Sequence, residues 1–426
     1  MKKKMFLFVF VLTCVCLLFA FAACKDVDDA PSGDISGSGD TTGESEDGGI
    51  HVYPTGWMKD SEYHWRLEQY TGIEIDRDKH NCDDYGVCEV CKYDTSNGFS
   101  FEKYTDADGE AYSVVGVRVL SKKMVIPSTF KGIPVKTITG GPNTFIVGRN
   151  YIESIVIPNS ITDIGYSAFK DCIVLKNITF EEGSQLQEIK GEVFNHCLRL
   201  ESINIPKSVT SVGSFAFKSC SSLSRVVFEE DSNLNTVGYD AFSNCSNLLS
   251  VEFGKNSKLE TIGQHAFKDA VKLKYIEMPD SIIKVDKMVF SGCDSLEYNE
   301  YNNGLYLGNE DNPYALFVEA KNKEITSCIV NENTKAISAL AFMFCENLNS
   351  VSLPTGLKGI GEQAFSYCIK LDILEIPSSV AFVADYAFSD MSAVLLCGAE
   401  SQPEGWSAKW NKSSDVLVRW GVSNVG

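Results

Sequence analysis

The sequence lacks the positive charge that a nucleic-acid-binding protein needs. Its 426 residues include 38 Lys and Arg against 57 Asp and Glu, which gives a formal net charge of −19. A phosphate backbone is bound by clustered basic residues, so this balance argues against nucleic acid as a partner. It argues equally against docking on an anionic membrane through charge alone.

The sequence also lacks the motifs of common enzymes. It has no Walker motif, no glycine-rich fingerprint after a strand and no HExxH. It has only five histidines, and His196 and His265 stand in repeat loops without a matched nucleophile and acid. The many Ser and Asp residues recur with a fixed period, which is typical of turns. We therefore expect a protein that is not an enzyme.

The first 23 residues are typical of a targeting signal. Three lysines at positions 2–4 precede an apolar stretch over residues 5–21, and Ala22 and Ala23 place small residues before Cys24. This end resembles the lipobox of bacterial lipoproteins, in which the cysteine becomes the lipidated first residue. The sequence predicts a signal peptide over 1–23 and lipidation at Cys24. An ordinary signal peptide cut near Ala23 and a retained membrane helix are the alternatives.

The segment after Cys24 has the composition of a tether. Residues 25–50 are rich in Ser, Gly, Thr, Asp and Glu and contain almost nothing apolar. Such a segment cannot bury enough surface to offset its ordering entropy. We expect residues 24–50 to form a lipidated, disordered acidic linker, so that the protein contacts the membrane only through its lipid anchor.

Residues 51–95 form a small region rich in cysteine and histidine. Cys88 and Cys91 have the CxxC spacing that lets two thiolates hold one tetrahedral ion, and His64 and His80 supply further candidate ligands. A structural zinc ion on these four residues is the only cofactor that the sequence suggests. Disulfides such as Cys82–Cys88 or Cys88–Cys91, or neither arrangement, are the alternatives.

The dominant feature of the sequence is a repeat of about two dozen residues that ends in Ala-Phe-x-x-Cys. The segments 200–222 (LESINIPKSVTSVGSFAFKSCSS) and 348–370 (LNSVSLPTGLKGIGEQAFSYCIK) are 23 residues long, and others carry two extra residues after the strand-like start. Ten regularly spaced starts identify an array of stacked units. The units begin at Ile152, Leu175, Leu200, Leu223, Leu248, Leu273, Leu296, Ile325, Leu348 and Leu371.

Each unit predicts one coil of a solenoid. Ile203 and Ile205 alternate with polar neighbours, as in a short half-buried strand, and Pro206 ends it. Phe217 and Cys220 then point inward from a tighter turn. The predicted fold is a mainly β (or α+β) repeat solenoid: a right-handed leucine-rich-repeat coil with a parallel strand ladder and short helical or 3-10 turns on the other side.

The repeat resembles the BspA-like class of leucine-rich repeats, found in surface proteins of anaerobic bacteria and some protists. The matching pattern is LxxIxIPxxVTxIGxxAFxxC, over residues 152–393, and residues 96–151 look like N-terminal capping strands and a first coil. The resemblance implies a secreted, lipid-anchored protein of the bacterial surface or outer envelope. It implies a binding or adhesion function toward an extracellular or host surface protein; a glycan-binding or envelope-scaffolding lipoprotein is the alternative.

Two segments depart from the repeat. Residues 296–324 contain apolar runs around turn clusters and predict a β-hairpin that projects from or flanks the solenoid, either as a contact region or as a spacer. Residues 394–426 predict a C-terminal cap in which Trp406, Trp410 and Trp420 cover the last coil, with sugar binding as the alternative role of these residues.

Two further sets of residues are candidates for structure or function. The exposed strand positions form the natural binding surface, with Arg225, Glu252, Tyr275 and Glu277 as candidate contacts. A ladder of inward cysteines, predicted to be free thiols that act as small hydrophobes, comprises Cys172, Cys197, Cys220, Cys245, Cys293, Cys345 and Cys368.

Overall fold

The computed structural model describes residues 97–422 except 119, 142–143, 146–147 and 413–414, together with the backbone of three earlier strands. These strands, β1 (Met58–Lys59), β2 (Tyr63–Leu67) and β3 (Glu74–Lys79), form one sheet in the order β1-β2-β3. The predicted signal peptide, the linker and Cys24 lie outside the described residues.

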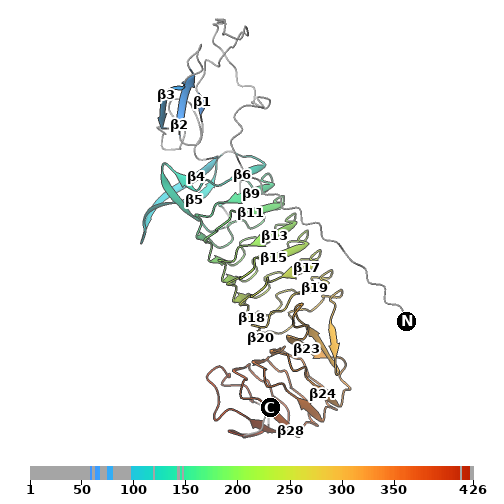
Figure 1. Cartoon of the computed structure of the whole chain (residues 1–426). Coiled ribbons are helices and arrows are strands. Elements are labelled where there is room, and N and C mark those ends of the chain that lie inside the picture. The colour runs from blue at the N-terminus through green and yellow to red at the C-terminus, as the bar shows by residue number, and fades with distance from the viewer. Residues whose placement is uncertain are drawn as a thin grey trace, which may run out of the picture. The chain divides into compact units, whose positions relative to one another are not determined.

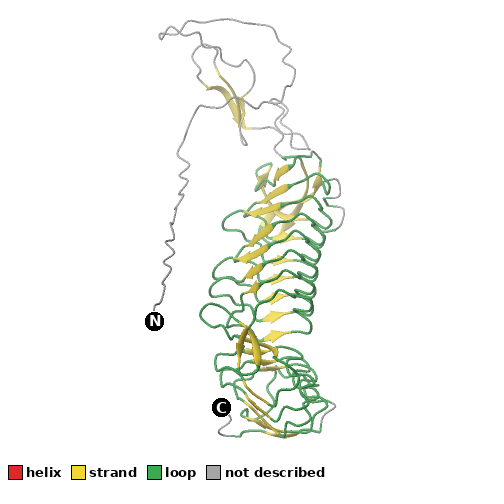
Figure 2. Ribbon diagram, turned by 90° about the vertical axis from the view of Figure 1, so that its right-hand side faces the viewer, coloured by secondary structure: helices red, strands yellow, loops and turns green. Residues whose placement is uncertain are grey.

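A ladder of parallel strands runs along one side of the coils (Figures 1 and 2). In each strand alternate side chains face inward: Ile203 and Ile205 are buried, whereas Ser202 and Asn204 are exposed. This ladder, which we call the first ladder, comprises β6 (Lys123–Val125), β9 (Ser154–Ile157), β11 (Asn177–Phe180), β13 (Ser202–Ile205), β15 (Arg225–Phe228), β17 (Ser250–Glu252) and β19 (Tyr275–Ile276).

A second parallel ladder, which the sequence did not reveal, follows the turn in each coil. Apart from β8, its strands are only two residues long, with one half-buried and one fully buried side chain, such as Ser211 and Val212. The ladder comprises β8 (Ile133–Ile138), β10 (Asp163–Ile164), β12 (Glu188–Ile189), β14 (Ser211–Val212), β16 (Thr236–Val237), β18 (Thr261–Ile262) and β20 (Lys284–Val285).

The N-terminal end of the second ladder is closed by a long hairpin. Strand β5 (Gly109–Val117) pairs in parallel with β8, and β4 (Phe99–Asp106) pairs antiparallel with β5. A short strand, β7 (Thr129–Phe130), pairs antiparallel with β8. The ring of Phe101 stacks on that of Phe130 with centroids 4.4 Å apart. These strands cover the first coil, whose backbone and apolar face would otherwise be open.

The predicted helical or 3-10 turns are not confirmed, because the described residues contain no helix and these segments are successions of turns. Phe215 and Ser219 adopt left-handed φ values of 62° and 60°. The N–H groups of Phe215, Phe217 and Ser219 therefore donate to carbonyls of the next coil at 2.7–2.9 Å. A helix would keep these bonds inside one coil, whereas this geometry creates a third set of bonds along the array.

The core is a stack of phenylalanine rings, one from each coil. Phe217 is fully buried and lies between Phe194 and Phe242, with ring centroids 5.2 and 5.0 Å away. A similar stack runs through Phe342, Phe365 and Phe388 in the later coils. The coils thus share continuous apolar cores, because no single coil could bury its own inner face.

The insertion at residues 296–324 does not project from the solenoid. Strands β21 (Asn299–Tyr301), β22 (Gly304–Leu307) and β23 (Leu316–Ala320) pair antiparallel in that order. Tyr306 and Phe317 of these strands are completely buried. The insertion therefore divides the repeats into two stacks, a first array of residues 97–298 and a second array of residues 299–422. There are two core clusters, and the first also includes Leu307, Leu316 and Ala336 from the start of the second array.

The second array rebuilds both ladders. Its outer strands are β24 (Ser327–Ile329), β26 (Ser350–Ser352), β28 (Ile373–Ile376), β30 (Val394–Cys397) and β31 (Leu417–Arg419). Its second ladder continues from β23 through β25 (Ala336–Ile337), β27 (Gly359–Ile360) and β29 (Phe382–Val383), all parallel.

The last coil of the first array lies against the outside of this later ladder. The Ala339 N–H donates to the Val285 carbonyl at 3.0 Å, and Lys287 Nζ lies 2.7 Å from Glu362 Oε1. A Cβ atom on Gly359 would stand 1.9 Å from the Ile283 carbonyl oxygen. Only glycine fits there. The backbones of the two arrays are therefore in direct contact at this position, which we call the side-by-side junction.

Two of the three C-terminal tryptophans lie in the core of the second array, and the third, Trp420, is partly buried against it. Trp406 and Trp410 are 4% and 3% exposed, and the Trp406 indole N–H donates to the Val380 carbonyl at 3.0 Å. Trp410 packs edge-on against Phe388. Rings placed in this way cover the last Phe of the stack and offer no open face for stacking on a sugar.

Replacing Phe217 by Ala should destabilise the first array strongly, because it opens a cavity inside the ring stack. We expect a loss of about 3–5 kcal/mol in the free energy of local unfolding, measured by native-state hydrogen exchange. Ser202→Ala, on the exposed side of β13, should change it by less than about 0.5 kcal/mol. Equal effects at the two positions would contradict the inward assignment.

Replacing Gly359 by Thr should loosen the contact between the arrays, because the added side chain would meet the Ile283 backbone. Overpacking of this kind costs about 1–3 kcal/mol. The measurement is thermal unfolding of the full chain, and the matched control is Ser211→Thr, at the equivalent, half-buried position of β14. An equal, small effect of both substitutions would contradict the side-by-side junction.

Candidate binding face

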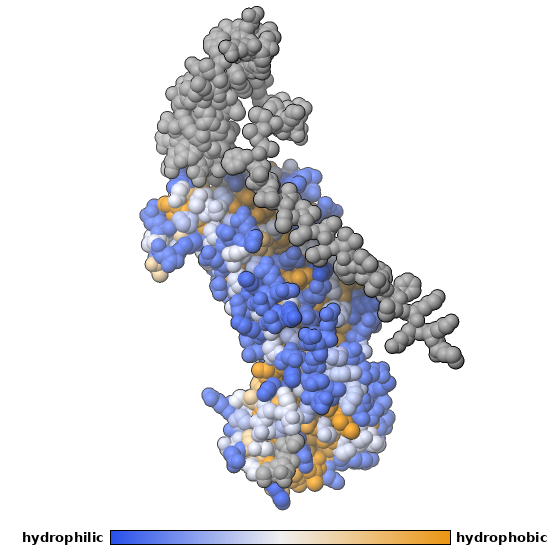
Figure 3. Space-filling view, in the orientation of Figure 1, coloured by the Kyte–Doolittle hydropathy of each residue, from blue (hydrophilic) through white to orange (hydrophobic). Residues whose placement is uncertain are grey.

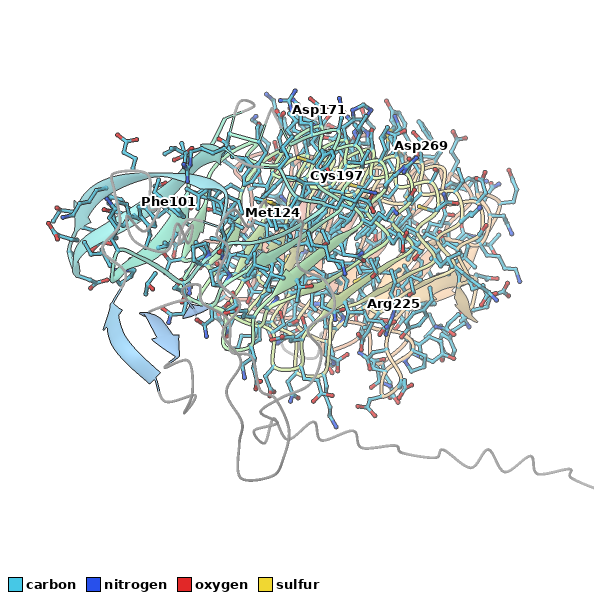
Figure 4. All side chains as sticks on the ribbon, turned by 90° about the horizontal axis from the view of Figure 1, so that it is seen from above. Phe101, Met124, Asp171, Cys197, Arg225 and Asp269 are labelled. Carbon is cyan, nitrogen blue, oxygen red and sulfur yellow. The ribbon has the colours of Figure 1, made fainter. Side chains whose placement is uncertain are left out.

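Three of the four predicted contact residues lie together on the exposed side of the first ladder. The strand register aligns Arg225, Ser250 and Tyr275 in one row across β15, β17 and β19. Viewed along the coils, Arg225 lies on one side of the array, and Asp171 and Asp269 lie on the opposite side (Figure 4). The sequence-predicted residues therefore share the strand side and are separated from the turns.

Arg225 and Glu252 form a two-point ion pair. Arg225 Nε lies 2.9 Å from Glu252 Oε1, and Nη2 lies 2.6 Å from Oε2. The carboxylate raises the pKa of the Arg225 guanidinium through this hydrogen bond. A bidentate pair holds both long side chains in one conformation. These side chains therefore lose less conformational entropy when a partner binds.

Tyr275 is the large exposed side chain at the centre of this region. It is 44% exposed, whereas Ile276, the other residue of β19, is buried. Partial burial raises the pKa of its hydroxyl, and the carboxylates of Glu277, Glu310 and Glu252 raise it further. Tyr275 therefore presents a neutral ring and an O–H group that can both donate and accept.

Glu277 has a different task from the one that the sequence suggested. Its Oε2 accepts the N–H groups of Phe253 and Gly254 at 2.9 and 3.1 Å. The carboxylate thus satisfies backbone donors at the end of β17. Glu229 does the same for the Lys207 N–H at 2.9 Å. Glu277 supports the coil beneath Tyr275 and has little freedom to contact a partner.

The insertion lies directly beside this part of the strand face. The Met278 N–H donates to the Gly308 carbonyl at 2.8 Å, and Asn309 Nδ2 donates to the Met278 carbonyl at 3.0 Å. These bonds hold the loop that carries Glu310 at the end of β19. The structure therefore joins two regions that the sequence indicated separately. We define the candidate binding face as Arg225, Glu252, Tyr275 and Glu310.

The surface around this face is mostly hydrophilic. In the space-filling view, blue side chains dominate the first array, and hydrophobic residues are more frequent over the later coils (Figure 3). On the first ladder the exposed rows carry small polar groups such as Ser154, Asn177 and Ser202. Tyr275 is thus a single aromatic anchor in a polar, solvated surface.

The cysteine ladder lies inside the coils and away from the face. Each of its seven thiols is free and buried, as are those of Cys328 and Cys397, which the sequence analysis did not include. The thiol of Cys220 donates to the Phe194 carbonyl at 3.1 Å, and that of Cys245 to the Phe217 carbonyl at 3.2 Å. Each such bond satisfies a carbonyl at the turn, so the cysteines serve the scaffold.

The predicted zinc ligands cannot be placed. His80, Cys88 and Cys91 lie outside the described residues, and of His64 only the backbone, in β2, is described. Within the part of the chain whose side chains are described, no group of three or more His, Cys, Asp or Glu residues is arranged to hold a metal ion.

The buried thiols should resist alkylation in the folded protein. Burial raises the pKa of Cys245, Cys293 and Cys368 to about 12, so the reactive thiolate is absent at pH 8. Peptide mapping after iodoacetamide treatment should show these three cysteines unmodified until denaturant is added, whereas an exposed Ser202→Cys variant should react at once. Modification of the native thiols at the rate of this control would contradict their burial.

The same shifts predict a loss of stability at high pH. The folded state keeps the proton on these thiols up to about pH 12, whereas thiols in the unfolded chain ionise near their ordinary pKa of 9.0. The contribution of the neutral, buried thiols to the free energy of unfolding is therefore complete below pH 9. It is lost as the pH rises from 9 toward 12.

Stacked coils with a parallel strand ladder and an inward Phe–Cys corner define a leucine-rich-repeat solenoid. The chain belongs to the BspA-type leucine-rich repeat family, whose sequence profile matches it in six copies, over residues 141–259, 229–311 and 315–395. No curated protein matched the sequence. In the described residues we find no helix whose length and apolar character would suit a membrane span.

Several solved structures are similar to this chain. A leucine-rich cell surface protein from Faecalibacterium prausnitzii is 19% identical, with a TM-score of 0.33, and the match covers 76% of this chain and 94% of that one. A leucine-rich repeat protein from Bacteroides ovatus is 20% identical, with a TM-score of 0.35 and coverage of 77% and 92%. The pneumococcal vaccine antigen PcpA is 21% identical, with a TM-score of 0.38 and coverage of 78% and 88%.

Proposed function

We propose that the protein is a non-catalytic surface protein that binds another protein through the candidate binding face. The observation that carries this proposal is the exposed Tyr275 ring, which shares a row with Arg225 of the fixed Arg225–Glu252 pair and lies on the strand that the insertion loop adjoins. Tyr and Arg are the residue types that most often dominate binding energy at protein interfaces.

The scaffold favours such a role, because it holds the face rigidly. Tyr275 lies on a strand whose neighbour is hydrogen-bonded in register, and the insertion loop is bonded to the residue that follows β19. A surface that is ordered before binding loses less entropy on association. The partner we propose is an extracellular or host surface protein, with adhesion as the outcome of binding.

We also place the protein on the bacterial surface, held by a lipid at Cys24. This part of the proposal is supported by the signal-like N-terminal sequence with its small residues before Cys24, and by membership of the BspA-type family. The acidic segment of residues 25–50 would then separate the solenoid from the membrane.

The test is binding of the full-length protein to an array of purified extracellular-matrix proteins. Tyr275→Ala should weaken binding to a captured protein by about tenfold or more, which corresponds to about 1.4 kcal/mol. The matched control is Tyr166→Ala, which removes a tyrosine that is 63% exposed in the turn segment after β10. Equal losses in the two variants, or no captured protein on the array, would contradict the proposal.

A further inference from the structure

A cleft opens where the two arrays meet side by side. Its volume is about 480 Å³, which lies in the range of small-molecule binding sites. One wall comes from the last coils of the first array, with Gln264, Lys284 and Lys287. The opposite wall comes from the second array and its C-terminal cap. The cleft exists because Gly359 allows the arrays to touch. It lies on the second-ladder side of the coils whose first-ladder strands carry the candidate binding face.

All the charged side chains of the cleft except Glu404 already have partners. Lys287 Nζ lies 2.7 Å from Glu362 Oε1 across the cleft, and Lys284 Nζ lies 3.2 Å from Asp286 Oδ1 on one wall. On the cap wall, Asp385 accepts a hydrogen bond from the Ser407 hydroxyl. These side chains are between one quarter and two fifths exposed, so they still face the solvent in the cleft.

This arrangement selects against an anionic ligand. The lining has four carboxylates, those of Asp286, Glu362, Asp385 and Glu404, against two lysines. An anion would therefore meet excess negative charge and would have to displace an existing pair, which is costly in a partly buried site. A ligand without net charge can bind while both lysine pairs stay in place.

The paired groups nevertheless keep unused hydrogen-bonding capacity. An ammonium group has three donors and a carboxylate about four acceptor positions, and each pair uses only part of them. The Gln264 amide and the Glu404 carboxylate make no hydrogen bond or ion pair with other described residues. Donors and acceptors thus alternate around one space. Vicinal hydroxyl groups, which donate and accept at short spacing, match this arrangement.

An aromatic side chain completes the cleft. Phe382 stands in the same row as Gly359, where the first array carries Ser211, Thr236 and Thr261. Its ring lines the cleft, and Lys284 Nζ stands over the ring at 5.9 Å from its centroid. An apolar ring among amide, carboxylate and ammonium groups suits a ligand that has one face of C–H groups and an edge of hydroxyl groups.

We propose that this cleft binds a neutral, polyhydroxylated ligand, of which a short uncharged oligosaccharide is the chemical class. Phe382 contacts the apolar face of a sugar ring, and Gln264, Glu404 and the paired lysines and carboxylates bind its hydroxyl groups. The site is separate from the candidate binding face, so the protein carries one surface for a protein and one for a glycan.

The experiment is a glycan array probed with the full-length protein, with matched neutral and anionic oligosaccharides, followed by titration of the best neutral probe. Binding of neutral probes is the expected result. Gln264→Ala and Glu404→Ala, each at a surface position, should fold normally and together weaken the titrated affinity by about tenfold or more. Glu375→Ala, an exposed carboxylate on β28 outside the cleft, is the matched control and should leave the affinity unchanged.

Three outcomes would overturn the proposal: no neutral probe bound at millimolar concentration, a preference for anionic probes, or an affinity that the cleft variants and Glu375→Ala change equally. Phe382→Ala adds a second measurement, and its folding is checked by the thermal transition. Tyr275→Ala should leave glycan affinity intact while it weakens binding to the protein array. Failure of the cleft and failure of the binding face are therefore distinguishable.

Discussion

The whole structure depends on one constraint: the backbone of each coil finds its hydrogen-bond partners in the neighbouring coils. Two parallel ladders and the third set of bonds at the Phe–Cys corner all run along the array. Within a single coil, the only backbone hydrogen bonds are those of the turns. Coils are therefore stable only in a stack, and both ends of the stack must be covered. The hairpin of β4 and β5 closes one end, and Trp406 and Trp410 cover the other.

The repeating parts of this design could be predicted from the sequence, whereas its short elements could not. The sequence itself shows the period of the repeat and the alternation of buried and exposed strand residues. It also shows the inward positions, such as Phe217 and Cys220. The second ladder was missed because a two-residue strand shows no alternation. The turns were expected to be helical because nothing in the residue types of Phe215 and Ser219 indicates a left-handed backbone. The insertion was expected to project from the solenoid or to flank it, but Tyr306 and Phe317 lie in the core.

The candidate face was predictable only in part. A fixed period places Arg225 and Tyr275 in one row, so their proximity followed from the repeat. The role of Glu277 did not follow, because its partners are backbone N–H groups of the preceding coil. Contacts between residues about 75 positions apart, such as Lys287 with Glu362, obey no period. Their only trace in the sequence lies in the second ladder. The second array carries Ala336, Gly359 and Phe382 in the row where the first array carries the polar residues Ser211, Thr236 and Thr261.

The side-by-side junction at Gly359 also limits how this protein can change its length. A coil added or removed between β9 and β17 would leave every contact between Ile283 and Gly359 in place, because each coil touches only its neighbours. It would change only how far the N-terminal cap lies from Tyr275. A coil added between β25 and β29 would instead move Phe382 and the cap wall away from Lys284. The first array is therefore free to grow, while the second is fixed in size by the cleft that it completes.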